Sequence, residues 1–167
     1  MLSESARMSS AAEARFRVQA PNSLPRAIKV IAMDASSDDV VKGLAGRSWH
    51  HASFFTAAPA PVKSSGDVRS AWLTDLEGRT ADLIDEVDRA DLVVLVASPG
   101  GHAERASLIG EACSRGRVMT TALVVSAASA SEEDLAKTLA QLRPWSLMVV
   151  IANASDYIED MLTALRA

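Results

Sequence analysis

The residues best suited to chemistry lie in the segment Ser98-Pro99-Gly100-Gly101-His102, which directly follows a strongly apolar run. The two glycines allow backbone N–H groups to come close to a ligand, and the N-terminus of a helix beginning here would favour an anion. Ser98 can donate its hydroxyl proton, and His102 can bind an anion or move a proton. The segment therefore predicts a site for a phosphate-bearing ligand.

A second polar segment, DASSDD, begins at Asp34 directly after an earlier apolar run. Asp34 and Ser36 from this segment, with Asn153 after a later apolar run, complete the predicted ligand-binding set. Carboxylates here would repel a phosphate unless a cation lay between them. Phosphoryl-transfer chemistry on Asp34 would also need an aspartate and a lysine where Ser98 and Asn153 stand, so we assign no catalytic residue.

Three other chemical readings are weaker. His50 and His51 are adjacent, and adjacent residues of a strand point to opposite faces, so they cannot both line one metal site if that segment is extended. We therefore predict no metal site. Cys113 falls on the apolar stripe of an expected helix, which favours a buried, inert thiol. Ser98 lacks the G-x-S-x-G context of an acyl-transfer nucleophile.

The composition excludes several classes of protein. The chain has 167 residues, 49% of them apolar and 23% charged, which fits one globular domain. A net charge of −4 argues against a nucleic-acid partner, and a single cysteine excludes a disulfide framework. No apolar run approaches the length of a membrane span, and the first residues do not resemble a secretory signal. We therefore expect a cytoplasmic domain with no membrane span.

The elements that must position these residues can be assigned from the hydrophobic pattern. Residues 1–25 are expected to form a flexible arm and residues 26–167 a single domain. Apolar runs predict five strands, and the intervening amphipathic segments predict helices. The strands are expected over residues 27–33, 49–57, 91–97, 118–126 and 146–153. The helices are expected from Ser36 or Ser37, from Asp67 to about Val87 as one helix or as two divided at Gly78, from His102, from Ser131 and from Ser155.

Strands that are apolar throughout are buried on both faces, as in a parallel sheet covered by crossover helices. The order of elements thus predicts an α/β fold with three layers: a doubly wound, mainly parallel, Rossmann-like sheet of about five strands in the order 2-1-3-4-5, with helices on both faces. Ligands bind such sheets where the loops after strands one and three separate. Those loops contain Asp34 and the segment from Ser98 to His102.

From about Ile28 to Leu162, the chain resembles a shortened, degenerate form of the FtsZ/tubulin-type GTPase domain. The strings IKVIA at Ile28–Ala32 and ADLVVLVA at Ala90–Ala97 are similar to two strands of that family, and the order of elements after them also agrees. The family's GGGTGTG phosphate loop is reduced here to Gly100 and Gly101, and its activation domain would lie beyond Ala167. The resemblance implies the fold of the nucleotide-binding half. The lost loop argues against GTP hydrolysis by the family's mechanism, which uses a neighbouring subunit.

Two functions remain open. We expect a non-catalytic, GTPase-like module without a cofactor that acts through a protein partner or as a homo-oligomer. The alternative is a small-ligand enzyme or sensor that binds GTP, another nucleotide or a different phosphate-bearing molecule at the loops after strands one and three. Exposed tryptophans could anchor a partner, although we expect at least two of Trp49, Trp72 and Trp145 to be buried in the core.

Overall fold

The computed structural model describes residues 24–57, 72–152 and 156–167. Most of the expected N-terminal arm, the segment from 58 to 71 and Asn153 lie outside these ranges.

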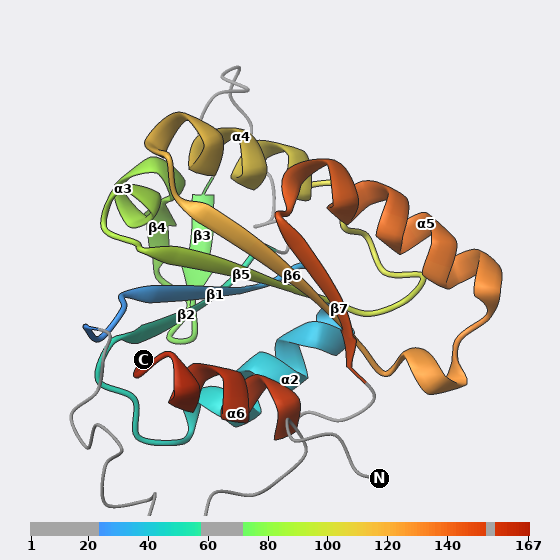
Figure 1. The fold of residues 1–167 in the computed structure, drawn as a ribbon, viewed down its shortest axis with the longest axis horizontal. Coiled ribbons are helices and arrows are strands. Elements are labelled where there is room, and N and C mark those ends of the chain that lie inside the picture. Colours follow the sequence, from blue (N-terminus) through green and yellow to red (C-terminus); the bar gives the residue numbers. More distant parts are fainter. Residues whose placement is uncertain (1–23, 58–71, 153–155) are drawn as a thin grey trace, which may run out of the picture.

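A seven-stranded sheet in the order β4-β3-β2-β1-β5-β6-β7 forms the centre of the protein (Figure 1). Every pairing among β2, β1, β5, β6 and β7 is parallel. These strands are the five predicted ones, in the predicted order, with the bounds Ile28–Ala32 for β1, Ala52–Thr56 for β2, Leu92–Ala97 for β5, Met119–Val125 for β6 and Met148–Ala152 for β7. The predicted α/β class is therefore confirmed.

The prediction of a helix from Asp67 to about Val87 is wrong for residues 72–82 and confirmed for its last residues, which belong to α3 (Leu83–Asp88). Residues 67–71 lie outside the described ranges. Residues Trp72–Asp75 form β3 and residues Thr80–Asp82 form β4, an antiparallel hairpin that makes the sheet mixed and raises the strand count from the expected five to seven. The turn between the two strands is built on Asp75, whose carboxylate accepts hydrogen bonds from the N–H groups of Glu77 and Arg79 at 3.0 and 2.8 Å. Gly78 supplies the left-handed backbone that the turn requires, with φ at +81°.

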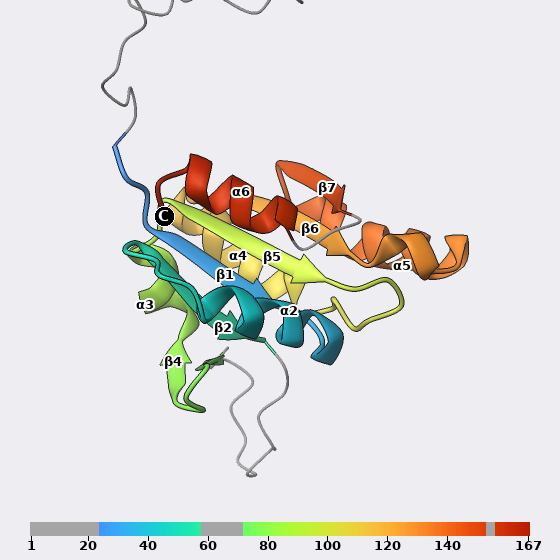
Figure 2. The same ribbon diagram turned by 90° about the horizontal axis from the view of Figure 1, so that it is seen from below.

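Helices cover both faces of the sheet (Figures 1 and 2). On one face, α2 (Ala35–Ala45) and α6 (Asp156–Ala164) pack on the strands, and on the other face lie α3 (Leu83–Asp88), α4 (Ala106–Gly116) and α5 (Glu132–Leu142). Two 3₁₀ turns, η2 (Ala127–Ser129) and η3 (Arg143–Trp145), flank α5. All residues of β1 and β5 are buried, because each face of these strands contributes to one of two apolar cores.

Two helix starts differ from expectation. The N-cap of α2 is Asp34, and neither Ser36 nor Ser37 takes that role. Ser37 is instead the third helical residue, and its hydroxyl accepts a hydrogen bond from the Asp34 N–H in a capping box. Helix α4 begins at Ala106, four residues after His102. Ser131 caps α5 as predicted, since its hydroxyl accepts a hydrogen bond from the Asp134 N–H.

Candidate functional site

The loops that follow β1 and β5 lie side by side, as the strand order predicts. The carboxylate oxygen Oδ2 of Asp34 accepts a hydrogen bond from the backbone N–H of Ser98 at 2.7 Å. The Met33 N–H donates to the Val96 carbonyl at 2.8 Å, which continues the pairing of the two strands up to the loops. The two polar segments identified in the sequence therefore meet at one edge of the sheet.

Asp34 is held at both of its carboxylate oxygens. While Oδ2 takes the Ser98 N–H, Oδ1 accepts the N–H of Ser37 in the first turn of α2 at 2.9 Å. A carboxylate at a helix N-terminus is stabilised by the helix dipole as well as by these bonds. The negative charge next to the Ser98–His102 loop is therefore the protein's own, fixed in place by two N–H groups.

Three other N–H groups at the glycine loop are also engaged within the protein, whereas the His102 N–H forms no hydrogen bond with the described residues. Gly100 donates to Oγ1 of Thr138 at 3.0 Å, Gly101 donates to the Ser98 carbonyl at 3.0 Å, and Ala103 donates to Oε1 of Gln141 at 3.1 Å. Thr138 and Gln141 belong to α5, and the Thr138 side chain is buried. A ligand phosphate would have to break these bonds before it could use the same N–H groups.

We call this loop closed, because protein acceptors already take the N–H groups of Ser98, Gly100, Gly101 and Ala103. The two glycines fit this arrangement. A Cβ on Gly101 would lie 2.6 Å from Oδ2 of Asp34 and 2.7 Å from its Cγ, closer than real Cβ atoms approach other atoms. Gly100 has φ at +77°, and a Cβ there would lie 3.2 Å from Cγ of Asp134. Gly101 is thus required by the close approach of Asp34, and Gly100 is favoured by its left-handed backbone.

The remaining predicted ligand-binding residues are not drawn into one cluster. Ser98 is buried, whereas Ser36 and His102 are exposed. Because α4 begins only at Ala106, the expectation that the glycines open this helix and present its N-terminus to an anion is wrong. Asn153 lies outside the described residues, so its predicted role stays a prediction.

The histidines and the cysteine that the sequence analysis considered occupy different environments in the structure. Among residues 24–57, 72–152 and 156–167, no group of three or more histidine, cysteine or acidic side chains could hold a metal ion. His50 and His51 are both exposed. Cys113 is buried, as predicted, and burial raises the pKa of its thiol above the ordinary value. None of the helices described is long and apolar enough to cross a membrane.

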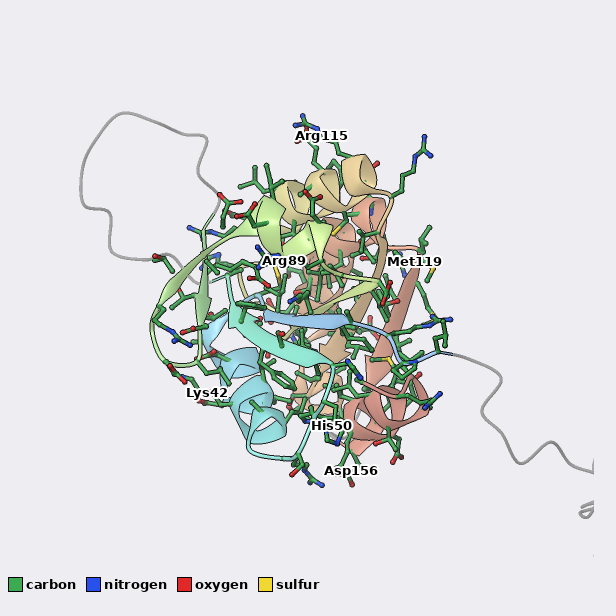
Figure 3. All side chains as sticks on the ribbon, turned by 90° about the vertical axis from the view of Figure 1, so that its left-hand side faces the viewer. Lys42, His50, Arg89, Arg115, Met119 and Asp156 are labelled. Atoms are coloured by element: carbon green, nitrogen blue, oxygen red, sulfur yellow. The ribbon has the colours of Figure 1, made fainter. Side chains whose placement is uncertain are left out.

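An apolar surface at the β7 edge of the sheet is the feature that the sequence did not reveal. We call it the β7 surface; its exposed members are Met119, Trp145, Leu147, Met148 and Ile151. Met119 lies on the outside of the protein at the start of β6 (Figure 3). A cavity of about 400 Å³ opens beside Trp145 and Leu147, and the Ser146 hydroxyl that lines it is buried without a hydrogen-bond partner among the described residues.

The sequence signal for this surface was ambiguous because an uncharged, apolar run is typical of a strand buried in the middle of a sheet. Trp145 is exposed, and Trp49 is only partly buried, with its ring N–H donating to the Leu44 carbonyl at 2.8 Å. The expectation that at least two of the three tryptophans are in the core is therefore wrong.

No protein-family model and no curated protein matches this chain.

Proposed function

We propose that this chain is a non-catalytic, cytoplasmic α/β domain of the FtsZ/tubulin-like, Rossmann-like type, and that it acts as a protein-interaction module by associating with a second copy of itself. The observation that supports the non-catalytic part of the proposal is the hydrogen bond from the Ser98 N–H to the Asp34 carboxylate. In a nucleotide-binding relative of this fold, a ligand phosphate would be expected at this edge of the sheet. Here a carboxylate of the protein accepts the Ser98 N–H at this edge.

Binding of a phosphate at this loop would carry a free-energy cost. A phosphate entering the loop would have to displace Asp34, which accepts one hydrogen bond at each carboxylate oxygen. Hydrogen bonds to charged groups contribute about 1.5–3 kcal/mol each, so the displacement would cost about 3–6 kcal/mol. Since about 1.4 kcal/mol corresponds to a tenfold change in affinity, this penalty alone would weaken nucleotide binding by about two to four orders of magnitude.

The β7 surface supports a second copy as the partner. Strand β7 pairs with β6 on one side and has no strand neighbour on the other among the described residues. An exposed, apolar edge strand is a template for pairing with another chain. In a two-fold contact each strand meets its own copy, so a charged strand would repel itself. The sequence of β7, MVVIA, carries no charge, and Met148 and Ile151 expose side chains on it.

The test of this proposal is the oligomeric state of the full chain, measured by sedimentation velocity over a range of concentrations. We expect a concentration-dependent dimer that Ile151→Lys dissociates, because the substitution places a charge on each copy at the pairing edge. Ile84→Lys is the matched control: Ile84 is 58% exposed on α3 and Ile151 is 47% exposed on β7. A monomer at every concentration, or equal behaviour of the two variants, would refute self-association.

A thermal-shift measurement with GTP and ATP distinguishes our proposal from the alternative of a nucleotide sensor. A ligand at about 100 times its dissociation constant stabilises a protein by about 2.7 kcal/mol if it binds only the native state. We expect no change in melting temperature, because the N–H groups of Ser98, Gly100, Gly101 and Ala103 are occupied. A nucleotide-dependent rise that Gly101→Asp abolishes would replace our proposal with nucleotide binding at this loop.

A further inference from the structure

A second cavity lies at the opposite end of the parallel strands from Asp34. It has a volume of about 530 Å³, within the range of ligand pockets, and is lined by residues of β1, β2, the β3–β4 hairpin and α3. The cavity exists because β2 pairs with β3 only at Phe55 and Thr56. The first three residues of β2, Ala52–Phe54, have no strand neighbour on that side among the described residues, and the hairpin diverges from them.

A buried lysine lines this cavity. Lys29 is the second residue of the central strand β1 and is 9% exposed. Its ammonium donates to Oε2 of Glu86 at 2.7 Å and to the Ser53 hydroxyl at 3.3 Å, and it lies 5.7 Å from the centre of the Phe55 ring. An ammonium has three N–H donors, and no third acceptor is present among the described residues.

The ion pairs around the cavity leave one cation unpaired. The Lys29 ammonium is paired with Glu86, and two of the three lining arginines also form ion pairs: Arg79 with Asp75 and Glu77, and Arg47 with Glu159. Arg89, the residue at the C-cap of α3, is exposed and has no ion-pair partner in the described part of the chain. Figure 3 shows it between α3 and the strands β1 and β2. The four cations and four carboxylates of this set balance in number, because Arg79 is shared by two carboxylates, and Arg89 is the cation that lies outside every ion pair of the described residues.

The rest of the lining is suited to an apolar group. Trp49, Phe54, Phe55 and Leu76 all contribute to the wall. A doubly charged phosphate would exceed the single unpaired cation and would face the carboxylates of Asp75 and Glu86. A carboxylate carries one charge and accepts hydrogen bonds from both an ammonium and a guanidinium.

We propose that this cavity binds an organic monocarboxylate. Its carboxylate accepts from the free Lys29 N–H and from the Arg89 guanidinium, and its apolar body lies against the aromatic wall. This site does not depend on the glycine loop or on the β7 surface, so it stands or falls separately from the proposed self-association.

The proposal is tested by isothermal titration calorimetry of the full chain with benzoate and hexanoate, and with their neutral amides as matched probes. We expect at least one carboxylate to bind, its amide not to bind, and Arg89→Gln to weaken binding about tenfold to a hundredfold, since a charge-assisted hydrogen bond is lost. Arg89 is exposed, so the variant keeps the fold, which circular dichroism checks.

The control variant is Arg117→Gln. Arg117 is also an exposed arginine at a helix C-cap, and it lines the cavity beside Trp145. We expect this variant to bind the carboxylate like the unaltered chain. Absence of carboxylate binding, equal binding of an amide, tighter binding of inorganic phosphate, or a loss of affinity in Arg117→Gln but not in Arg89→Gln would each overturn the assignment.

Discussion

Replacing Gly101 with alanine should destabilise the protein, although alanine is generally more favourable than glycine in a folded chain. The reason is the contact with Asp34: the added Cβ would lie 2.6 Å from Oδ2 and 3.0 Å from Cβ of that residue. The backbone of Gly101 is not in the left-handed region, so the effect arises from this contact and not from backbone strain. Either Asp34 or the loop must move.

The magnitude follows from what Asp34 loses when it moves. Its role as the N-cap of α2 contributes about 0.5–2 kcal/mol, and its hydrogen bond from the Ser98 N–H contributes about 1.5–3 kcal/mol. We therefore expect Gly101→Ala to lower the free energy of unfolding by about 2–5 kcal/mol. For a chain of this size, each kcal/mol lowers the melting temperature by about 2–4 °C.

The assay is urea unfolding followed by circular dichroism, with Gly43→Ala as the control. Gly43 lies within α2, and a Cβ there would meet no atom within 4 Å. In a helix, alanine is more stable than glycine by about 0.5–1 kcal/mol, so Gly43→Ala should raise the free energy of unfolding. The same chemical change is thus expected to have opposite signs at the two positions.

A double-mutant cycle with Asp34→Gly shows whether the contact is the cause. Removing the Asp34 side chain removes the atoms that the new Cβ would meet, so Gly101→Ala should then cost less than about 1 kcal/mol. If Gly101→Ala is neutral or stabilising in the unaltered chain, or equally costly with and without the Asp34 side chain, the argument for the closed loop fails.

Two further predictions concern buried ionisable groups. Lys29→Met should lower the free energy of unfolding by about 3–5 kcal/mol, because it leaves Glu86 without its cation. The double variant Lys29→Met with Glu86→Leu should regain most of that free energy. Urea titration measures both variants, and similar stability of the single and double variants would contradict this prediction. Burial raises the pKa of the Cys113 thiol, so the stability this gives is present below the ordinary value of 9.0 and is lost as the pH rises above it. The melting temperatures of the unaltered chain and of Cys113→Ala should therefore converge as the pH rises above 9.0, and a constant difference there would refute the burial argument.

The fold was predictable where one interaction dominates. The runs that became β1 and β5 are apolar at nearly every position, and a continuous apolar run between helices indicates a strand covered on both faces. The β3–β4 hairpin was missed because Leu76 continues the helical spacing of Leu83 and Val87, which do lie in a helix, α3. The decisive local feature was the turn at Asp75 and Gly78, which outweighs this spacing.

The location of the candidate site could be predicted from the sequence, but not whether its backbone N–H groups are free to bind a ligand. The strand order alone brings Asp34 and Ser98 to one edge. Whether the loop N–H groups are free depends on Thr138 and Gln141, which follow Gly100 and Ala103 by 38 positions in each case and reach the loop only because α5 packs there. The exposure of β7 likewise depends on its position at the edge of the sheet, which its own sequence does not encode.

The closed loop also explains why a single substitution cannot convert this edge into a nucleotide site. Removing the Asp34 carboxylate would free the Ser98 N–H, but Gly100, Gly101 and Ala103 would still donate to Thr138, Ser98 and Gln141. An anion gains most when several N–H groups point at it together, and here those of Gly100, Gly101 and Ala103 remain committed to acceptors of the protein. Opening the loop would therefore require α5 to move away as well, and α5 is attached to the core through Leu139 and Leu142. The loop is better suited to holding α5 and α2 in fixed positions around the sheet than to exchanging a ligand.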